Sequence, residues 1–416
     1  MAPPAPSAIS VIGAGVAGCA LVAGLRRGGW SGELSLWESG RGPGGRTATR
    51  RSRQDAGLRI DHGAPLFNIS GTPPVLLAPL LAGGMIEAWR EPRGRLDATG
   101  QLHPEDNRDP LAEGELYRGV GGMDGLCAGL LALAAEHTAP APAVTAHYGI
   151  LVSDLAVAPN GRWQLFDRDR QLLAEVDWLV LAGSLLAHPR SRLLLAWDSV
   201  PLQTAAQSLA DPDLQHGLAA LASIRSEARS NLMLVAEGAD AAAWLRCPFR
   251  LLRFDAAAEQ HWRLSRLSIQ PLEDGRVAVV AHSSAIFAAE HLSVYGSRSS
   301  IALQLGRPPR QEEEQAVIEA LSEAVQDALA AWLEPGLVSR GKRELMRWGA
   351  AFPNQPGLPE DLLLCQRSRV GFCGDYVAGV GFGRVEGALR SSERLSALLL
   401  AQAGEESALL GTAPVH

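Results

Sequence analysis

The chain has 416 residues, of which 47% are hydrophobic, so it can bury a sizeable core and has the length of two or three domains. Its formal charge of −7 argues against a nucleic-acid binder, because such proteins usually have a basic balance. The five cysteines are scattered without a CxxC pair, which argues against zinc and thioredoxin-like motifs and favours a reducing compartment.

The sequence gives no indication of a signal peptide or a membrane-spanning segment. No uninterrupted apolar run approaches the roughly 18 residues that a membrane span needs. Residues 1–10 lack the basic and apolar regions of a signal peptide. We therefore expect a soluble, cytoplasmic protein without a membrane span or a metal site, whose partner is a small molecule.

The first seventy residues begin with a β-turn-α-β unit. Ala8 to Ile12 predicts a short buried strand, and a glycine-rich turn then leads into an apolar helix that ends near Arg27. Leu34 to Glu38 predicts the second strand. Residues 71–114 are broken by proline and glycine, and we expect them to be irregular.

The middle of the chain predicts a helix, a hairpin and a parallel strand. The helix covers Asp124 to Glu136. Asn160-Gly161 separates two apolar runs, Ile150 to Val157 and Trp163 to Asp167, which is a strong hairpin signal. Trp178 to Ala182 is expected to be a buried parallel strand.

The pattern of apolar and polar residues along the chain changes near His188. Two runs alternate apolar and polar residues, as half-exposed antiparallel strands do, and these are Leu251 to Ile269 and Arg276 to His282. The remaining predicted elements are an amphipathic helix, a short buried strand and an apolar helix, at Gln311 to Trp332, Arg369 to Phe372 and Val385 to Ala403. The tail after Gly404 is expected to fray.

The first motif is a dinucleotide-binding turn between a strand and a helix. Its glycines allow a tight turn, close approach of a pyrophosphate and close helix packing, while the helix N-terminus attracts the phosphates. Glu38 ends the second strand, where its carboxylate can accept hydrogen bonds from a ribose. An ordinary glycine-rich surface turn would not explain Glu38. The residues expected at the cofactor are Gly13, Ala14, Gly15, Val16, Ala17, Gly18 and Glu38.

The second motif follows Glu38 and indicates which dinucleotide is bound. It reads Ser39-Gly40-Arg41-Gly42-Pro43-Gly44-Gly45-Arg46. The paired glycines leave room for a ligand, and Arg41 and Arg46 can neutralise two phosphate charges. This arrangement resembles the flavin amine oxidase superfamily. The resemblance implies that Gly44 and Gly45 press against the flavin side of FAD, with Ser39 and the two arginines also at the cofactor.

Asp61-His62-Gly63-Ala64 resembles the Asp-x-Gly-Ala element of the same superfamily. The resemblance implies that the backbone of Gly63 and Ala64 lies beside the isoalloxazine ring. His62 occupies the variable place of this element. Its ordinary pKa suits acid–base chemistry, so it is a candidate catalytic residue, with a structural neighbour as the alternative.

The closing motif lies near the C-terminus, at Gly371-Phe372-Cys373-Gly374-Asp375 and then Gly383-Arg384-Val385-Glu386-Gly387-Ala388. By resemblance, Asp375 holds a ribityl hydroxyl of FAD. The helix that follows points its N-terminus at the flavin and stabilises the negative charge of the reduced ring. The cofactor residues expected here are Gly374, Asp375, Gly383, Arg384, Val385 and Ala388.

Looser matches narrow the resemblance to renalase-like proteins within this superfamily. The Gly122-Met123 turn opens a helix, and Arg347-Trp348-Gly349-Ala350-Ala351-Phe352-Pro353 resembles a Trp-x-x-Ala-x-Pro element. A strand valine that meets the adenine is matched best by Val152, with Ile150 as an alternative. Trp348 is a candidate for the wall of the catalytic pocket, although a core position is an equal alternative.

The predicted fold class is α/β, with a discontinuous Rossmann-type FAD-binding domain and an inserted mixed α+β substrate domain that contains an antiparallel sheet. The FAD-binding domain is assigned to residues 1–70, 115–187 and 361–403. The substrate domain is assigned to residues 71–114 and 188–360, and a flexible tail to residues 404–416.

The predicted function is that of an FAD-dependent oxidase. The resemblance implies oxidation of a small reduced substrate, either a dihydro-NAD(P) isomer or an amine, by hydride transfer to flavin N5, with oxygen as the electron acceptor. We expect non-covalent FAD, because Cys365 lacks the glycine and tyrosine that flank the attachment cysteine of monoamine oxidases. The alternatives are a desaturase- or reductase-like flavoprotein and an FAD-binding protein without turnover.

Overall fold

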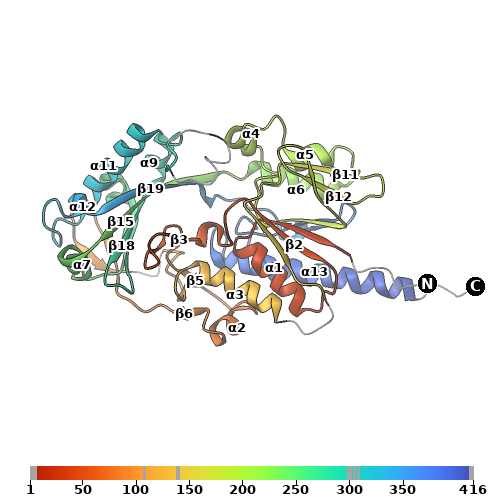
Figure 1. The fold of residues 1–416 in the computed structure, drawn as a ribbon, viewed down its shortest axis with the longest axis horizontal. Coiled ribbons are helices and arrows are strands. Elements are labelled where there is room, and N and C mark those ends of the chain that lie inside the picture. The colour runs from red at the N-terminus through yellow and green to blue at the C-terminus, as the bar shows by residue number, and fades with distance from the viewer. Residues whose placement is uncertain are drawn as a thin grey trace, which may run out of the picture.

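The structure, a computed structural model, has two lobes, each built around a large sheet (Figure 1). It describes residues 7–105, 109–136, 141–297, 302, 306 and 310–411. Helices α1, α3 and α13 belong to one lobe, whereas α9, α11 and α12 accompany the sheet of the other (Figure 1).

The first sheet has six strands in the order β10-β2-β1-β14-β21-β20. All neighbours pair in parallel except β20 and β21, and β1 lies between β2 and β14. Short apolar runs such as Ile9–Ile12 suit this sheet because its central strands are covered on both faces. The strands are β1 (Ile9–Ile12), β2 (Leu34–Glu38), β10 (Thr145–Tyr148), β14 (Trp178–Leu181), β20 (Leu364–Cys365) and β21 (Val370–Phe372).

Three helices pack together against this sheet. They are α1 (Val16–Arg27), α3 (Asp124–Ala135) and α13 (Val385–Gly411). Small residues let α1 approach α13 closely, because a Cβ atom on Gly28 would lie 2.2 Å from Cδ1 of Leu400. Leu21, Leu126 and Leu395 share one buried apolar cluster, so these helices and the first sheet form a common core.

The second sheet has seven strands in the order β19-β15-β18-β17-β16-β7-β8. It is antiparallel except where β16 pairs with β7. Its strands are β7 (Arg93–Leu96), β8 (Leu102–Pro104), β15 (Ser226–Ala236), β16 (Leu251–Phe254), β17 (Leu264–Pro271), β18 (Val277–Ser283) and β19 (Lys342–Pro353). Its helices are α7 (Gly238–Leu245), α8 (Ala256–Trp262), α9 (Ala285–Glu290), α11 (Gln311–Ala328) and α12 (Leu337–Arg340).

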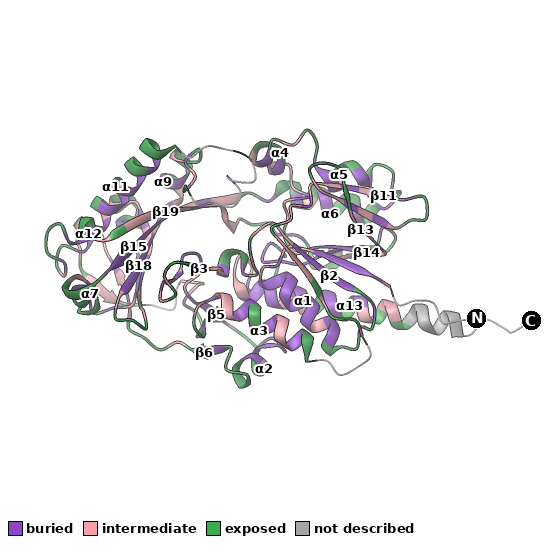
Figure 2. Ribbon diagram, viewed as in Figure 1, coloured by how far each residue is buried: buried purple, intermediate pink, exposed green. Residues whose placement is uncertain are grey.

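Smaller elements complete the two lobes. Buried residues concentrate in α1, β2 and β14 of one lobe and in β15 and β18 of the other (Figure 2). Three small sheets pair β3 (Thr49–Arg51) with β4 (Arg59–Asp61), join β5 (Phe67–Ile69), β9 (Glu115–Gly119) and β6 (Ile86–Ala88), and join β11 (Asp154–Val157), β12 (Trp163–Phe166) and β13 (Leu172–Val176). The remaining helices are α2 (Leu77–Ala82), α4 (Arg190–Leu195), α5 (Pro201–Ala206), α6 (Pro212–Ser223), η1 (Gly45–Thr47) and η2 (Glu360–Leu362).

Residues 71–114 are more regular than expected, and their apolar contacts go to both lobes. Leu77 and Leu80 of α2 join the core of the first sheet, because they form an apolar face that packs on α3. In contrast, β7 and β8 extend the second sheet. Helices α5 and α6, which fall in the range assigned to the substrate domain, bury Leu202 and Leu214 with the hairpin β11–β12. The domain bounds remain a prediction from sequence.

Several element ends also differ from the expectation. The run Leu251 to Ile269 is interrupted by α8, which Asp255 caps by accepting a hydrogen bond from the Ala258 N–H. Strand β11 begins at Asp154 rather than Ile150, and α11 ends at Ala328. Helix α13 continues past Gly404 to Gly411, whereas residues 412–416 of the expected tail lie outside the described residues.

Among the residues that the structure describes, no helix has both the length and the apolar character that crossing a bilayer requires.

Candidate functional site

A cavity of about 650 Å³ is lined by residues from both lobes. One part of its wall comes from the glycine-rich turns of the first lobe. The other part comes from β15, β17, β18 and β19 of the second sheet. The volume lies within the range of about 300–1,000 Å³ that is usual for small-molecule and cofactor sites.

The first glycine turn forms one end of this cavity. Gly15 precedes α1 without a side-chain cap, so the helix N-terminus is available to an anion. Gly13 has a φ of +108°, which favours glycine. A Cβ atom on Gly18 would lie only 1.9 Å from the Gly13 carbonyl oxygen. The three glycines therefore serve the turn, the cavity and the helix packing, as the motif predicts.

Glu38 is fixed beside this turn by backbone donors. Its Oε2 accepts a hydrogen bond of 2.9 Å from the Ala14 N–H, and its Oε1 accepts one of 2.6 Å from the Gly40 N–H. Glu38 also lines the cavity. The carboxylate thus has a defined position at the end of β2, where a ribose could reach its remaining acceptor sites.

The second glycine turn docks directly on the first. The Gly44 N–H donates to the Ala14 carbonyl oxygen at 2.8 Å, and Gly15 and Gly44 form a parallel bridge. A Cβ atom on Gly45 would lie 3.2 Å from the Gly15 Cα atom. A Cβ atom on Gly44 would lie 2.8 Å from the Ala48 Cα atom, so close backbone packing requires both glycines, and their contact with a flavin stays a prediction.

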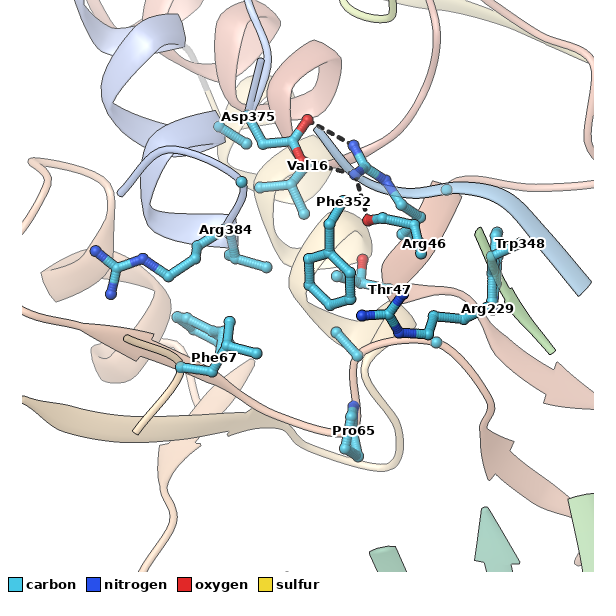
Figure 3. Close-up of a pocket in the computed structure, with 18 of the residues that line it drawn as sticks. Val16, Arg46, Thr47, Pro65, Phe67, Arg229, Trp348, Phe352, Asp375 and Arg384 are labelled. Atoms are coloured by element: carbon cyan, nitrogen blue, oxygen red, sulfur yellow. Dashed lines mark hydrogen bonds and ion pairs between the residues drawn. The ribbon is translucent and has the colours of Figure 1, made fainter. Parts of the chain in front are cut away.

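Arg46 and Asp375, which both line the cavity, pair directly with each other. Both terminal nitrogens of the guanidinium, Nη1 and Nη2, donate to the carboxylate at 2.6 Å, and Nη1 also donates to the Ala351 carbonyl oxygen (Figure 3). The sequence assigns these two residues to separate parts of the cofactor. The pairing shows that the second glycine turn, β19 and the closing loop meet at one point.

His62 and Trp348 are neighbours, but only Trp348 lines the cavity. The rings lie 5.4 Å apart between centroids, and Trp348 Nε1 donates to the His62 carbonyl oxygen at 3.2 Å. The His62 side chain is buried. Burial, with a contribution from Arg50, lowers the pKa of His62 to about 4, so its imidazole is neutral near pH 7. A chemical role for either residue stays a prediction.

The segment after His62 also contacts the second glycine turn. The Ala64 N–H donates to the Arg46 carbonyl oxygen at 2.9 Å. A Cβ atom on Gly63 would lie 2.0 Å from that oxygen and 3.3 Å from the Trp348 ring. Glycine at 63 is therefore required by close packing, and both Gly63 and Ala64 line the cavity.

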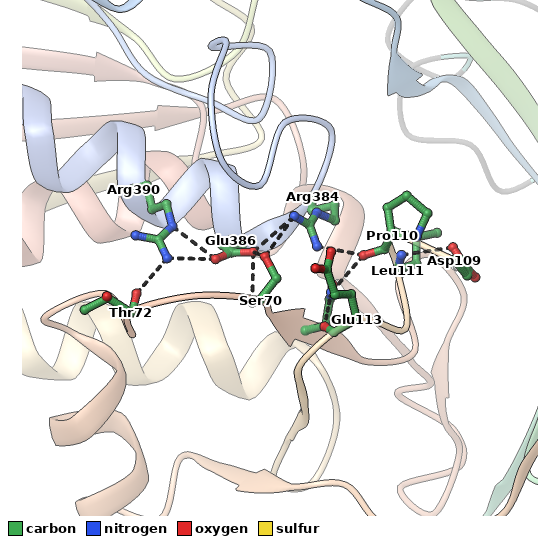
Figure 4. Close-up of polar contacts among 10 residues, drawn as sticks. Ser70, Thr72, Asp109, Pro110, Leu111, Glu113, Arg384, Glu386 and Arg390 are labelled. Carbon is green, nitrogen blue, oxygen red and sulfur yellow. Dashed lines mark hydrogen bonds and ion pairs between the residues drawn. The ribbon is translucent and has the colours of Figure 1, made fainter. Parts of the chain in front are cut away.

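The closing helix α13 has a buried carboxylate in its first turn. Glu386 is fully buried and accepts hydrogen bonds from Ser70 and Arg390, and it forms an ion pair of 3.2 Å with Arg384 (Figure 4). Burial raises the pKa of the Glu386 carboxyl, but hydrogen bonds from Arg390 and Ser70 outweigh this, so the net shift is downward. Two guanidinium groups around one carboxylate leave the helix N-terminus with a net positive charge.

Most of the predicted cofactor residues line the cavity. They are Gly13, Gly15, Val16, Ala17, Glu38, Gly44, Gly45, Arg46, Gly63, Ala64, Gly374, Asp375, Gly383, Arg384, Val385 and Ala388. Ala14, Gly18, Ser39, Arg41 and Val152 are not among the lining residues. Ala14 and Gly18 shape the turn, Arg41 is exposed, and Val152 is buried in the cluster of β11 and β12. Their contact with a cofactor stays a prediction.

Sequence reasoning named Trp348 of β19 but missed the other residues that the second sheet contributes to the cavity wall. Arg229 on β15 lies over the Phe352 ring, with 5.3 Å from its guanidinium carbon to the ring centroid, and it donates to Glu227. Asn231, His282 and Arg266 also line the cavity. The alternation of apolar and polar residues in β17 and β18 predicts which residues share one face of the sheet. No local sequence signal shows that the polar face lies opposite the glycine turns.

The depressed pKa of His62 gives a testable dependence of stability on pH. Between pH 6.5 and about 4 the unfolded imidazole is protonated while the folded one is neutral, so lowering the pH favours unfolding. From pH 7 to pH 5, His62 should account for about 2 kcal/mol of the decrease in unfolding free energy. His62→Phe should therefore show a decrease smaller by about this amount in denaturant titrations at the two pH values.

The matched control for this experiment is His216→Phe, which replaces an exposed imidazole on α6. It should retain the wild-type pH dependence. Equal pH dependence of the wild type and His62→Phe would contradict a buried, neutral His62.

Comparisons with known proteins agree with this architecture. A model of the NAD(P)-binding Rossmann-like domain matches residues 11–78, and no curated protein matches the sequence. Cyclohexylamine oxidase from Brevibacterium oxydans IH-35A is 13% identical with a TM-score of 0.61, covering 96% of this chain and 100% of that one. Wild-type putrescine oxidase bound to putrescine is also 13% identical, with a TM-score of 0.57 and coverage of 95% and 99%.

A third similar structure is the putative protoporphyrinogen oxidase from Exiguobacterium sp. 255-15. It is 11% identical with a TM-score of 0.59, over 95% of this chain and 99% of that one. At these identities the likeness concerns the fold. The predicted α/β fold is confirmed: the chain combines a Rossmann-type dinucleotide-binding region with the overall architecture of these oxidases.

Proposed function

We propose that the chain is a renalase-like, FAD-dependent oxidoreductase that oxidises a small reduced substrate, either a dihydro-NAD(P) isomer or an amine. The observation that carries the proposal is the shared cavity. Its wall joins the dinucleotide-binding turns at Gly15 and Gly45 to the aromatic residues Trp348 and Phe352 of β19. The names of the similar solved structures, which are oxidases, support the reaction class.

The residues of the first lobe fit FAD. The uncapped N-terminus of α1 and the paired glycines suit a pyrophosphate, since side chains at Gly15 and Gly45 would fill its place. Glu38 suits the adenosine ribose, and Asp375 suits a ribityl hydroxyl once its pairing with Arg46 is shared or exchanged. When bound, FAD supplies an acceptor for two electrons and a proton, delivered as hydride, with oxygen as the proposed final acceptor.

The other cavity residues would orient the substrate and exclude water. Trp348 and Phe352 offer flat apolar surfaces, and the indole of Trp348 is held by its hydrogen bond to the His62 carbonyl oxygen. Orientation in a dry cavity accounts for much of the rate of such a reaction, without a dedicated proton donor. His62 and Trp348 are therefore proposed to act chiefly through the position that they give to the cavity wall.

Non-covalent binding of FAD predicts that acid precipitation releases all the flavin. Cys19, Cys127, Cys247, Cys365 and Cys373 are all buried, and the described residues that line the cavity include no cysteine. The yellow supernatant should contain FAD by chromatography, and the pellet should be colourless. Flavin that stays in the washed pellet would contradict the non-covalent proposal.

Substitutions in the turns should weaken FAD binding in a definite order. Glu38→Ala should cost about 1–3 kcal/mol of binding free energy, because a charged acceptor is lost. Gly15→Val should cost more, because the added side chain occupies the space between the turns. Titration of the FAD-free protein with FAD measures both effects.

Gly42→Val is the matched control, because a Cβ atom on Gly42 would meet nothing within 4 Å. It should bind FAD as tightly as the wild type. Wild-type affinity in Gly15→Val would show that the turn is not the pyrophosphate site.

Rapid mixing with candidate reductants tests the reaction itself. We expect 2- or 6-dihydro isomers of NAD(P) to bleach the flavin absorbance within the mixing experiment, and oxygen to restore it. Fast bleaching by primary amines alone would favour the amine arm, and bleaching only by ordinary NADPH would replace the proposal with a reductase. If no reductant bleaches the flavin, the oxidase proposal fails.

A further inference from the structure

A row of polar side chains crosses the second sheet and faces the cavity. Asn231 on β15 is the direct cross-strand partner of His282 on β18. His282 pairs in turn with Arg266 on β17, and Arg266 pairs with Arg253 on β16. All four line the cavity. Because direct cross-strand neighbours have Cβ atoms about 5 Å apart, Asn231 and His282 present their side chains side by side.

Two polar atoms of this pair are buried without a partner. Asn231 is fully buried, and its Nδ2 donates to the His62 carbonyl oxygen at 2.7 Å. Its Oδ1 and the Nε2 of His282 are buried, and neither makes a hydrogen bond within the described part of the chain. Leaving such atoms unsatisfied costs about 1–3 kcal/mol each, so the pair is suited to a ligand that supplies the missing partners.

The pair lies next to the segment that is proposed to contact the flavin. The His62 carbonyl oxygen accepts hydrogen bonds from both Asn231 and Trp348. The next residues, Gly63 and Ala64, line the same cavity. A group held by Asn231 and His282 would therefore be close to both Trp348 and the flavin segment.

The charges around the pair favour an uncharged ligand group over a cation. Burial has the largest effect on the pKa of His282, and the positive charges of Arg266 and Arg229 lower it further. Together these effects lower the pKa to about 3, so the imidazole is neutral. Of the nearby carboxylates, Asp109 accepts from Arg266 and Glu227 accepts from Arg229, while Glu259 lines the same cavity near Arg229 and burial raises its pKa. An ammonium placed at this pair would be repelled by the guanidinium groups of Arg266 and Arg229.

We propose that Asn231 and His282 are the substrate anchor and bind an uncharged amide-type head group, such as a primary carboxamide on a planar ring. Such a group offers an N–H to Asn231 Oδ1 and a second hydrogen bond to His282 Nε2. The inference rests on the proposed function and narrows its substrate to amide-bearing dihydropyridines rather than protonated amines. Asn231 also positions the flavin segment through the His62 carbonyl oxygen.

Calorimetric titration of the purified flavin-containing protein tests the anchor without requiring turnover. The probes are nicotinamide, pyridine and benzylamine, which share a planar ring but differ in the polar group. Nicotinamide should bind at least tenfold more tightly than pyridine, which lacks the carboxamide, and more tightly than benzylamine, which carries an ammonium. The proposal would be overturned if the wild-type protein bound pyridine as tightly as nicotinamide. It would also be overturned if the protein bound benzylamine more tightly than nicotinamide.

Variants then assign the binding to the two residues. Asn231→Leu and His282→Leu should each raise the Kd of nicotinamide about tenfold and leave that of pyridine within about twofold. His282→Gln keeps a donor and an acceptor and should stay within about threefold of the wild type. Ser283→Ala is the matched control, because Ser283 is the next residue on β18 and its hydroxyl interacts with the Ser230 N–H and the Ser284 carbonyl oxygen.

The outcomes separate the anchor from the proposed function. Unchanged nicotinamide affinity in folded Asn231→Leu and His282→Leu would overturn the anchor even if dihydro isomers reduce the flavin. Selective loss of nicotinamide binding would support the anchor even if no isomer reduces the flavin, in which case the proposed reaction fails. If a leucine variant does not fold, the ratio of nicotinamide to pyridine affinity in the wild type and in His282→Gln decides the question.

Discussion

The contact between the two glycine turns is the constraint on which the rest of the site depends. The Gly44 N–H donates to the Ala14 carbonyl oxygen, and the backbones approach closely here because a Cβ atom on Gly45 would lie only 3.2 Å from the Gly15 Cα atom. From this contact the chain continues to Arg46, whose carbonyl oxygen receives the Ala64 N–H. The positions of the proposed phosphate-binding turn and of the proposed flavin-contacting segment are thus set by one series of backbone hydrogen bonds.

The same region joins the two lobes through charge. The guanidinium of Arg46 binds Asp375 of the closing loop and the Ala351 carbonyl oxygen of β19, so elements from the beginning and the end of the chain meet beside the cavity. Glu386 plays a similar part at the start of α13, where it holds Ser70 and two arginines. These buried or half-buried pairs hold the closing loop and β19 beside the second glycine turn, and the proposed hydride transfer requires such fixed positions.

Local sequence signals predict the first lobe well because its chemistry is carried by the backbone. Glycine spacing, a strand that ends in Glu38 and the apolar periodicity of α1 and α13 each follow from short-range requirements. The second sheet is different. Strand β15 carries the polar cavity residues Arg229 and Asn231, and their neighbours in the cavity wall depend on its register with β18 and β19, which are far away in sequence. No local pattern contains that register.

The sequence also could not show which of the predicted site residues contact one another. Arg46 and Asp375 were each expected at the cofactor, but their mutual ion pair depends on the fold of the 328 residues between them. His62 sits in a recognisable element, yet its side chain is buried beside Trp348 and its backbone carbonyl is the group that organises Asn231. The motif does not show which way the His62 side chain points, because that direction depends on packing against distant residues such as Trp348.

The placement of α13 has a consequence for how the protein is made. Strand β21 and helix α13 complete the first sheet and cover α1, although β1 and α1 are synthesised first and α13 last. Until the ribosome has released the chain from Val370 onward, the apolar face of α1 lacks its cover. Such late, long-range closure slows folding and exposes apolar surface to other chains. The nascent protein should therefore depend on chaperones, and truncation before α13 should yield aggregates rather than a smaller folded unit.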